Sequence, residues 1–280
     1  MKREGAFLEM RIAGIILIST ILFSCNTLNQ DRVLSSGSMG LVESTPMIND
    51  FGKTVLERFD PPIGYDRVML SSDTFGQYLR TLSLKPEGAK AKLYNGKSKP
   101  NDDVYVSVVD LPISPKDLQS SSDAIIRLKA EYLFAQKKYD QIVFHVGEEP
   151  IRFADFAQGD FNREKFNQYL DHTMEKVSTP SFCEDLKKVK LSDLQVGDVF
   201  VQNSNPNGHA VIVVDLVKNS KGQKLFLLAQ SFQPAQEIQI IANPTRDDIS
   251  PWYELKEGEL LTPEWRFMTS DLMRFKDLPN

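Results

Sequence analysis

One histidine and one glutamine lie where two neighbouring strands would bring them together. His209 begins an apolar stretch that runs to Val217, and Gln230 ends a second such stretch after a short polar turn. Because side chains on a strand alternate faces, a turn centred between Ser220 and Lys221 places both side chains on one face, whereas a one-residue slip separates them. An imidazole held by an amide can serve as a general base near neutral pH.

Such a base needs a nucleophile, and the sequence offers two types of candidate. Cys183 is the only cysteine besides Cys25, and Ser121 lies in the run Ser120–Asp123 at a possible helix start. A serine beside a histidine can be activated as a nucleophile. Each candidate also has a structural explanation, since serines at helix starts commonly act as caps and single cysteines are commonly small buried side chains. His209 equally fits a polar residue at the head of a strand.

The segment around His209 resembles the core of NlpC-type peptidoglycan peptidases, which are papain-like cysteine hydrolases. It carries Gly197-Asp198 before one strand, His209 at the head of the next and Gln230 on the strand after that. Over about residues 160–242, the resemblance implies a papain-like core with His209 as base, Gln230 as its orienting residue and Asp198 in the cleft. The family has a cysteine at the start of the helix packed on the sheet, but the aligned residue here is Arg163, which favours a non-catalytic relative.

Hydrophobic periodicity predicts an α+β fold that would position these residues. The expected strands are 65–70, 104–111, 142–146, 199–202, 209–217, 225–230 and 237–241. The expected helices are 73–82, a long one from Pro115 to about 138 capped by Ser114, one from Asn162 to Val177, and a short one after Thr179. Short turns between the last four strands predict an antiparallel meander. The chain after Pro251 is expected to be irregular, with Trp252, Tyr253 and Trp265 pinned against the domain.

Three stretches resemble an uncharacterised family of exported bacterial proteins, a domain of unknown function. They are Pro61–Tyr65, Asp123–Leu133 and Leu227–Gln236, so the resemblance spans nearly the whole chain after its leader. It implies no substrate and no catalytic residue. Arg127 and Glu131 fall at i and i+4 in the second stretch, where they either pair on a helix surface or line the cleft.

The N-terminus predicts a bacterial lipoprotein. Arg11 precedes an uncharged run, 12–23, that is too short to span a bilayer and ends in a lipobox-like sequence before Cys25. We therefore expect a signal peptide over 1–24, with either Met1 or Met10 as the start, and lipid on Cys25. Residues 25–60 are expected to form a flexible tether that holds the domain off the membrane. The residue after the cysteine is not aspartate, which indicates the outer membrane.

Composition narrows the classes of partner. The chain has 280 residues and a net charge of −5, without a run of Lys or Arg suited to nucleic acid. His145 and His172 have no acidic or cysteine partner at metal-ligand spacing, and there is no glycine-rich phosphate loop, so neither a metal nor a cofactor is expected.

The sequence thus predicts one α+β domain over 61–280, with a papain-like antiparallel sheet and an N-terminal strand–helix–strand section. Three functions are consistent with it. The first is a membrane-anchored, non-catalytic module that binds cell-envelope peptide or glycan around His209 and Gln230. The second is a cell-wall amide hydrolase with His209 as base and Ser121 or Cys183 as nucleophile. The third is an envelope scaffold without a functional cleft.

Overall fold

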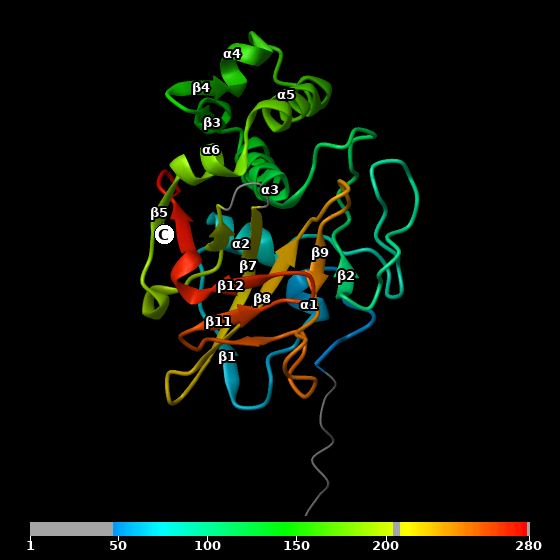
Figure 1. Ribbon diagram of the computed structural model, residues 1–280, viewed down its shortest axis with the longest axis vertical. Coiled ribbons are helices and arrows are strands. Elements are labelled where there is room, and N and C mark those ends of the chain that lie inside the picture. Colours follow the sequence, from blue (N-terminus) through cyan, green and yellow to red (C-terminus); the bar gives the residue numbers. More distant parts are fainter. Residues whose placement is uncertain (1–46, 204–207, 279–280) are drawn as a thin grey trace, which may run out of the picture. The chain divides into compact units, whose positions relative to one another are not determined.

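The computed structural model describes residues 47–203 and 208–278 (Figure 1). The predicted signal peptide, Cys25 and most of the predicted tether lie outside the described residues. The end of that tether, however, belongs to the folded domain. Helix α1 (Val55–Arg58) contributes Val55 to the core, and Phe59 is fully buried after it. A helix this short has no periodicity, so the sequence pattern could not reveal it.

The domain is α+β and is built on a nine-stranded antiparallel sheet. Seven strands follow the order β2-β9-β8-β7-β6-β13-β5. In addition, β1 pairs with β7, and β10 pairs with β8. Their bounds are β1 (Tyr65–Arg67), β2 (Tyr105–Val108), β5 (Leu186–Lys188), β6 (Val199–Gln202), β7 (His209–Asn219), β8 (Lys224–Gln230), β9 (Gln239–Ile241), β10 (Tyr253–Glu254) and β13 (Leu272–Phe275). The predicted meander β6–β7–β8–β9 is confirmed.

The C-terminal region is not irregular, contrary to the sequence-based expectation. It forms β10, β13, a separate hairpin of β11 (Glu259–Leu261) and β12 (Arg266–Met268), and the 3-10 turn η3 (Thr269–Asp271). β13 pairs with β6 and β5, which precede it in the chain by about 70 and about 85 residues. Strands of two to four residues with distant partners leave no local pattern. Trp252 and Tyr253 are buried in the core, as expected.

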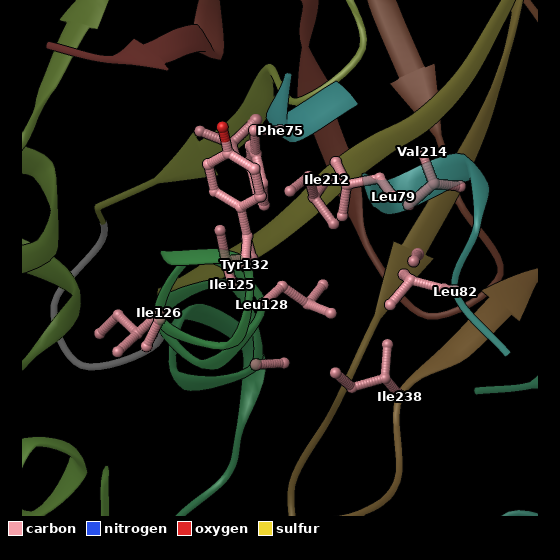
Figure 2. Close-up of a cluster of buried hydrophobic side chains, with 14 of the residues drawn as sticks. Phe75, Leu79, Leu82, Ile125, Ile126, Leu128, Tyr132, Ile212, Val214 and Ile238 are labelled. Carbon is pink, nitrogen blue, oxygen red and sulfur yellow. The ribbon is translucent and has the colours of Figure 1, made fainter. Parts of the chain in front are cut away.

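One face of the sheet is covered by helices. Helix α2 (Phe75–Arg80) and helix α3 (Ser121–Ala135) pack their apolar side chains against alternate residues of β7. Figure 2 shows this contact, in which Phe75, Ile125 and Leu128 gather with Ile212 and Val214 in one cluster. Burying such side chains is the main stabilising contribution to a domain of this kind.

Helix α3 begins later than predicted. The sequence pattern placed its start after Ser114, but the N-cap is Ser120, whose backbone N–H and hydroxyl both donate to Asp123 Oδ2. The preceding segment is held by distant partners instead: Asp117 accepts from the Ala235 N–H, and Gln119 donates to the Gln236 carbonyl. Two similar start signals compete in the sequence, and these tertiary hydrogen bonds decide between them.

A cap formed by residues 139–184 lies beyond one end of the sheet (Figure 1, green). It contains η1 (Tyr139–Gln141), β3 (Val143–Val146), β4 (Glu149–Arg152), α4 (Phe153–Ala157), α5 (Arg163–Lys176) and α6 (Thr179–Glu184). Asn162 caps α5, and the Thr179 helix forms, both as predicted. The predicted strand–helix–strand section exists as β2, α3 and β3, but β3 pairs with β4 in a separate hairpin rather than joining the main sheet.

The other face of the sheet is covered by the β11–β12 hairpin, which crosses the strands in Figure 1. Leu260 and Phe267 from this hairpin pack on Val211 and Val213 of β7. The short 3-10 turn η2 (Leu191–Asp193) precedes β6 and leads to Leu194 in the same cluster. The sheet is therefore the middle of three layers, with helices on one side and a hairpin on the other.

A β-bulge interrupts the pairing of β7 with β8. Lys218 pairs with Lys224 and Asp215 with Leu227, but Val213 pairs with Leu228, so Val214 is one residue extra on β7. The alternation of faces inverts at that point. Ile212 contacts the helix side before the bulge, and Val217 contacts the same side after it, although the two are five positions apart and would otherwise face opposite sides.

Candidate functional site

His209 and Gln230 meet on the hairpin side of the sheet. The His209 Nε2 lies 3.1 Å from the Gln230 Oε1, and the two residues are 2% and 1% exposed. The same-face placement predicted from the sequence is thus observed, although its derivation assumed an undisturbed ladder. The register at the turn alone would have separated the two residues, and the bulge at Val214 restores the odd register that brings them together.

Gln230 is held in turn by a buried ion pair that the sequence analysis did not identify. Its Nε2 donates to the Glu264 Oε2 at 2.6 Å, and the Lys99 Nζ donates to the same oxygen at 2.5 Å. Lys99 also donates to Gln239. Glu264 lies in the tip of the β11–β12 hairpin and Lys99 in a loop, so neither has a periodic pattern around it that could have marked it.

The His209 side chain lines a cavity at the end of β7 with a volume of about 280 Å³. The remaining lining residues are Ser121, Thr179, Gly208, Phe232, Gln233 and Trp265. The imidazole lies among three aromatic rings, with centroid distances of 4.9 Å to Phe232, 5.2 Å to Trp265 and 5.8 Å to Phe267. The cavity therefore combines a polar ring nitrogen with aromatic walls, a composition typical of small ligand sites.

Ser121 shares this cavity but is not joined to His209. It is the first residue of α3, on the helix side of the sheet, whereas His209 points to the hairpin side, and the two approach the cavity around the end of β7. Within residues 47–203 and 208–278, neither the Ser121 hydroxyl nor the His209 Nδ1 has a hydrogen-bond partner. The predicted base and one predicted nucleophile are brought together without a preformed hydrogen bond.

Burial sets the protonation state of His209. Removal from water lowers its pKa to about 4, and the nearby Lys99 charge acts in the same direction, while the hydrogen bond to the Gln230 carbonyl partly opposes both. Burial disfavours the charged imidazolium because a low-dielectric interior solvates it poorly. His209 is consequently neutral at pH 7, with one nitrogen protonated and the other able to accept a hydrogen bond.

Cys183 lies elsewhere. It is half-buried on α6, packs against the core of the helix side and does not line the cavity. Burial raises the pKa of its thiol, with only a small opposing effect of Lys188. A raised pKa reduces the thiolate fraction and makes Cys183 a poor nucleophile.

The three residues predicted to line the cleft also lie outside this cavity. Arg127 and Glu131 form the expected i, i+4 ion pair at 3.7 Å, but the pair is buried on α3 rather than on its surface. Glu131 Oε2 also accepts from Arg163 at 2.7 Å, and neither residue lines the His209 cavity. Asp198 is ion-paired with Arg274 at 2.5 Å. It lines a second, larger cavity of about 710 Å³ together with Leu216 and other residues.

Two further properties concern the described part of the chain. It contains no group of three or more His, Cys, Asp or Glu side chains arranged to hold a metal ion. Across the same residues, every helix is too short or too polar to span a bilayer.

The fold and the site define a class: an α+β protein with an antiparallel sheet between helices and a hairpin, and a cavity built around an amide-held histidine. The chain belongs to the family DUF4846, a domain of unknown function, whose model matches residues 55–162 and 152–274. This confirms the resemblance to an uncharacterised family noted in the sequence. No curated protein and no solved structure matches the chain.

Proposed function

We propose that this chain is a bacterial lipoprotein, anchored through Cys25, that uses the His209 cavity to bind a peptide or glycan of the cell envelope. The observation that supports it best is the pairing of a neutral, amide-held imidazole with the Trp265 ring in one cavity. An indole offers a flat apolar surface to a sugar ring or peptide unit, while the imidazole offers a hydrogen bond.

The size of the cavity limits what it can hold. Its volume of about 280 Å³ lies at the small end of the range for ligand sites, which is roughly 300–1,000 Å³. One sugar residue or one peptide unit would fill it, and the rest of a longer ligand would lie outside. This favours recognition of a chain end or of a single projecting group.

The papain-like arrangement is part of the proposal. His209 heads a strand, Gln230 holds its ring from the next strand, and Ser121 begins a helix packed on the sheet, which is the order that the NlpC-type resemblance implies. Arg163, the residue aligned with the family's cysteine, begins α5 in the cap, whereas Ser121 begins the helix that packs on the sheet. Because no hydrogen bond joins Ser121 to His209, the non-catalytic function is the preferred one.

Binding can be tested with the full-length chain carrying Cys25→Ser, which removes the proposed lipid acceptor. We would titrate it calorimetrically with soluble muropeptides, with the free stem peptide and with the free glycan. Trp265→Ala should weaken binding about tenfold or more, because a buried aromatic contact is lost. Phe161→Ala is the matched control, since Phe161 stacks on Tyr139 in the cap and does not line the cavity. Failure of all three ligands to bind the parent chain would reject the proposal.

The anchor can be tested separately in cells. The unmodified chain should incorporate a palmitate analogue and sediment with the outer-membrane fraction, and Cys25→Ser should abolish both. Equal labelling of the two proteins would exclude Cys25 as the lipidated residue.

Amide hydrolysis is the second candidate, favoured by the position of Ser121 in the cavity. In this reaction the Ser121 Oγ would attack the carbonyl carbon as its proton passes to His209 Nδ1, and the proton would then pass to the departing amine, leaving an acyl-serine for water to cleave. A fluorophosphonate probe and muropeptide turnover test it. Labelling and turnover that disappear in Ser121→Ala would establish the hydrolase.

A further inference from the structure

The Gln230 side chain lies between Glu264, which contacts its NH₂ group, and His209, which contacts its carbonyl oxygen. We propose that Glu264, with Lys99, fixes His209 as the Nε2–H tautomer, so that the cavity presents a ring nitrogen that only accepts hydrogen bonds and selects ligands with an uncharged donor. The ligand selection rests on the proposed binding function, whereas the tautomer does not.

The first step is the orientation of the amide. A carboxylate can only accept hydrogen bonds, so the Glu264 Oε2 requires the NH₂ end of Gln230 at 2.6 Å. The carbonyl end is then turned towards His209, where it lies 3.1 Å from Nε2. Rotating the amide by half a turn would place its oxygen against the carboxylate and lose that hydrogen bond, and its NH₂ end could donate to His209 only if Nε2 gave up its proton.

The second step is the role of Lys99. Its ammonium group lies 2.5 Å from the Glu264 Oε2, and both side chains are largely removed from water. Lys99 also donates to the Gln239 Oε1 at 3.1 Å, which fixes its position. A cation at this place holds the carboxylate in its accepting form, because charge-assisted hydrogen bonds strengthen when both partners are desolvated.

The third step concerns the imidazole. Since the Gln230 carbonyl can only accept, the His209 Nε2 must carry the proton and Nδ1 must hold a lone pair. The ring is confined by Phe232, Trp265 and Phe267, so exchanging the two nitrogens by a flip would disturb all three contacts. Gln230 and the three aromatic rings therefore hold the imidazole in this orientation.

The consequence is a chemical preference. Amide N–H and hydroxyl groups are donors and match Nδ1, whereas a carboxylate would meet a lone pair and be repelled. In an envelope fragment the donor would be either a peptide N–H or a sugar hydroxyl. This distinguishes the site from pockets that bind the carboxylate end of a peptide.

Nitrogen-15 spectra of the histidine rings test the tautomer directly. The chain has three histidines, and His145 is an internal contrast because its Nδ1, not its Nε2, meets Asp185 at 2.5 Å. In the Cys25→Ser chain, His209 should be purely Nε2–H with slow exchange of that proton. In the further variant Glu264→Leu, we expect the Nδ1–H form to rise to at least about a tenth of the population and exchange to accelerate about tenfold.

Two variants keep this test decisive. Lys99→Met/Glu264→Leu removes both charges, so it avoids an unpaired buried lysine if the single variant unfolds. Glu259→Leu is the matched control, because Glu259 is ion-paired with Arg266 on the same hairpin but does not contact Gln230. Unchanged tautomer and exchange in both the single and double variants would overturn the proposal.

The ligand preference has its own readout. Stem peptide and its N-methylated analogue, and glycan and its O-methylated analogue, are titrated against the parent chain. Methylation should weaken one of these two pairs about tenfold and so identify the source of the donor. Binding that ignores methylation in both pairs would overturn the preference but leave the proposed function intact. Absence of any binding would reject the proposed function and the preference, while the spectra still decide the tautomer.

Discussion

Strand β7 carries two buried polar centres, on opposite faces of the sheet, and they differ in how completely their hydrogen-bonding groups are satisfied. Asp215 lies on the helix side and His209 on the hairpin side. Both are almost completely buried. Their contacts indicate different roles, because a buried polar group that is fully paired stabilises the fold, whereas one with an open position is suited to binding.

At Asp215, both carboxylate oxygens are hydrogen-bonded, and the side chain is fully buried. Arg67 Nε donates to Oδ2 at 2.8 Å, Arg80 Nε donates to Oδ1 at 2.5 Å, and the Leu216 N–H donates to Oδ1 at 2.8 Å. Arg80 continues to the Val68 and Leu216 carbonyls. The carboxylate thereby ties α2 and β1 to the centre of the sheet, and nothing remains for a ligand to contact.

At His209, only Nε2 is hydrogen-bonded among the described residues. Nδ1 has no partner among them, and the His209 side chain lines a cavity. The supporting chain of Gln230, Glu264 and Lys99 is as well connected as the arginine pair of Asp215. The two centres therefore differ only in whether the central group, Asp215 or His209, keeps a hydrogen-bonding position that is open to a ligand. The following predictions test this contrast.

The largest effect is expected at Asp215. Asp215→Asn should destabilise the domain by about 3–5 kcal/mol, because two arginines are left buried without a compensating charge. Urea unfolding followed by circular dichroism measures this loss. An effect below about 1 kcal/mol would contradict the structural role assigned to this centre.

The second effect is a dependence of stability on pH. Since burial lowers the pKa of His209 to about 4 from 6.5, its contribution is fully present above pH 6.5 and is lost as the pH falls towards 4, by up to about 3 kcal/mol. Unfolding free energies measured between pH 7 and pH 4 should show this fall, and His209→Gln should remove it.

Asp123 must be separated from this measurement, because it acts in the opposite direction. Burial raises its pKa to about 7, so its contribution is present at low pH and is lost as the pH rises towards 7. Comparing the slopes of the parent chain and His209→Gln cancels the Asp123 contribution. Identical slopes would show that His209 is not buried as described.

The third prediction tests whether the Glu264–Lys99 ion pair itself stabilises the fold. Glu264→Leu should cost about 2 kcal/mol, since it leaves Lys99 buried without its carboxylate, whereas Lys99→Met/Glu264→Leu should recover most of this loss. Thermal and urea unfolding of the two variants provide the comparison. A double variant that is less stable than the single variant would mean that the charges stabilise the fold in their own right.

The smallest effect is expected at Ser121. Ser121→Ala should change the free energy of unfolding by no more than about 0.5 kcal/mol, because the hydroxyl has no hydrogen-bond partner among the described residues. Ser120→Ala is the contrasting variant, since it removes the capping box of α3 and should cost about 1 kcal/mol. Equal losses in the two variants would indicate that Ser121 has a structural partner.

The parts of the fold that the sequence predicted are those governed by nearby residues. The β6–β9 meander and α5 follow from short turns, alternation and the Asn162 cap, all of which act within a few residues. β13 and the start of α3 could not be predicted in this way, because distant partners determine both of them.

The residues of the candidate site likewise differ in whether nearby residues or distant partners determine their placement. His209 and Gln230 belong to adjacent strands, so their contact could be predicted from parity, although the bulge that permits it could not. Glu264 and Lys99 reach the site from loops separated by 165 residues, and no spacing rule connects them. Ser121 was named as a candidate, but its approach from the opposite side of the sheet depends on how α3 crosses the strands.

The extra residue on β7 acts on the strand as a frameshift acts on a reading frame. Asp215 and His209 are six positions apart, so in an uninterrupted strand they would point the same way. Loss of the single codon for Val214 would leave them five positions apart, so a regular strand would still direct them to opposite faces, with Val213 opposite Leu228 and Asp215 opposite Leu227 as before. Members of the family that lack this residue are therefore expected to have a regular β7 and to keep the cavity, because the bulge and the residue are lost together.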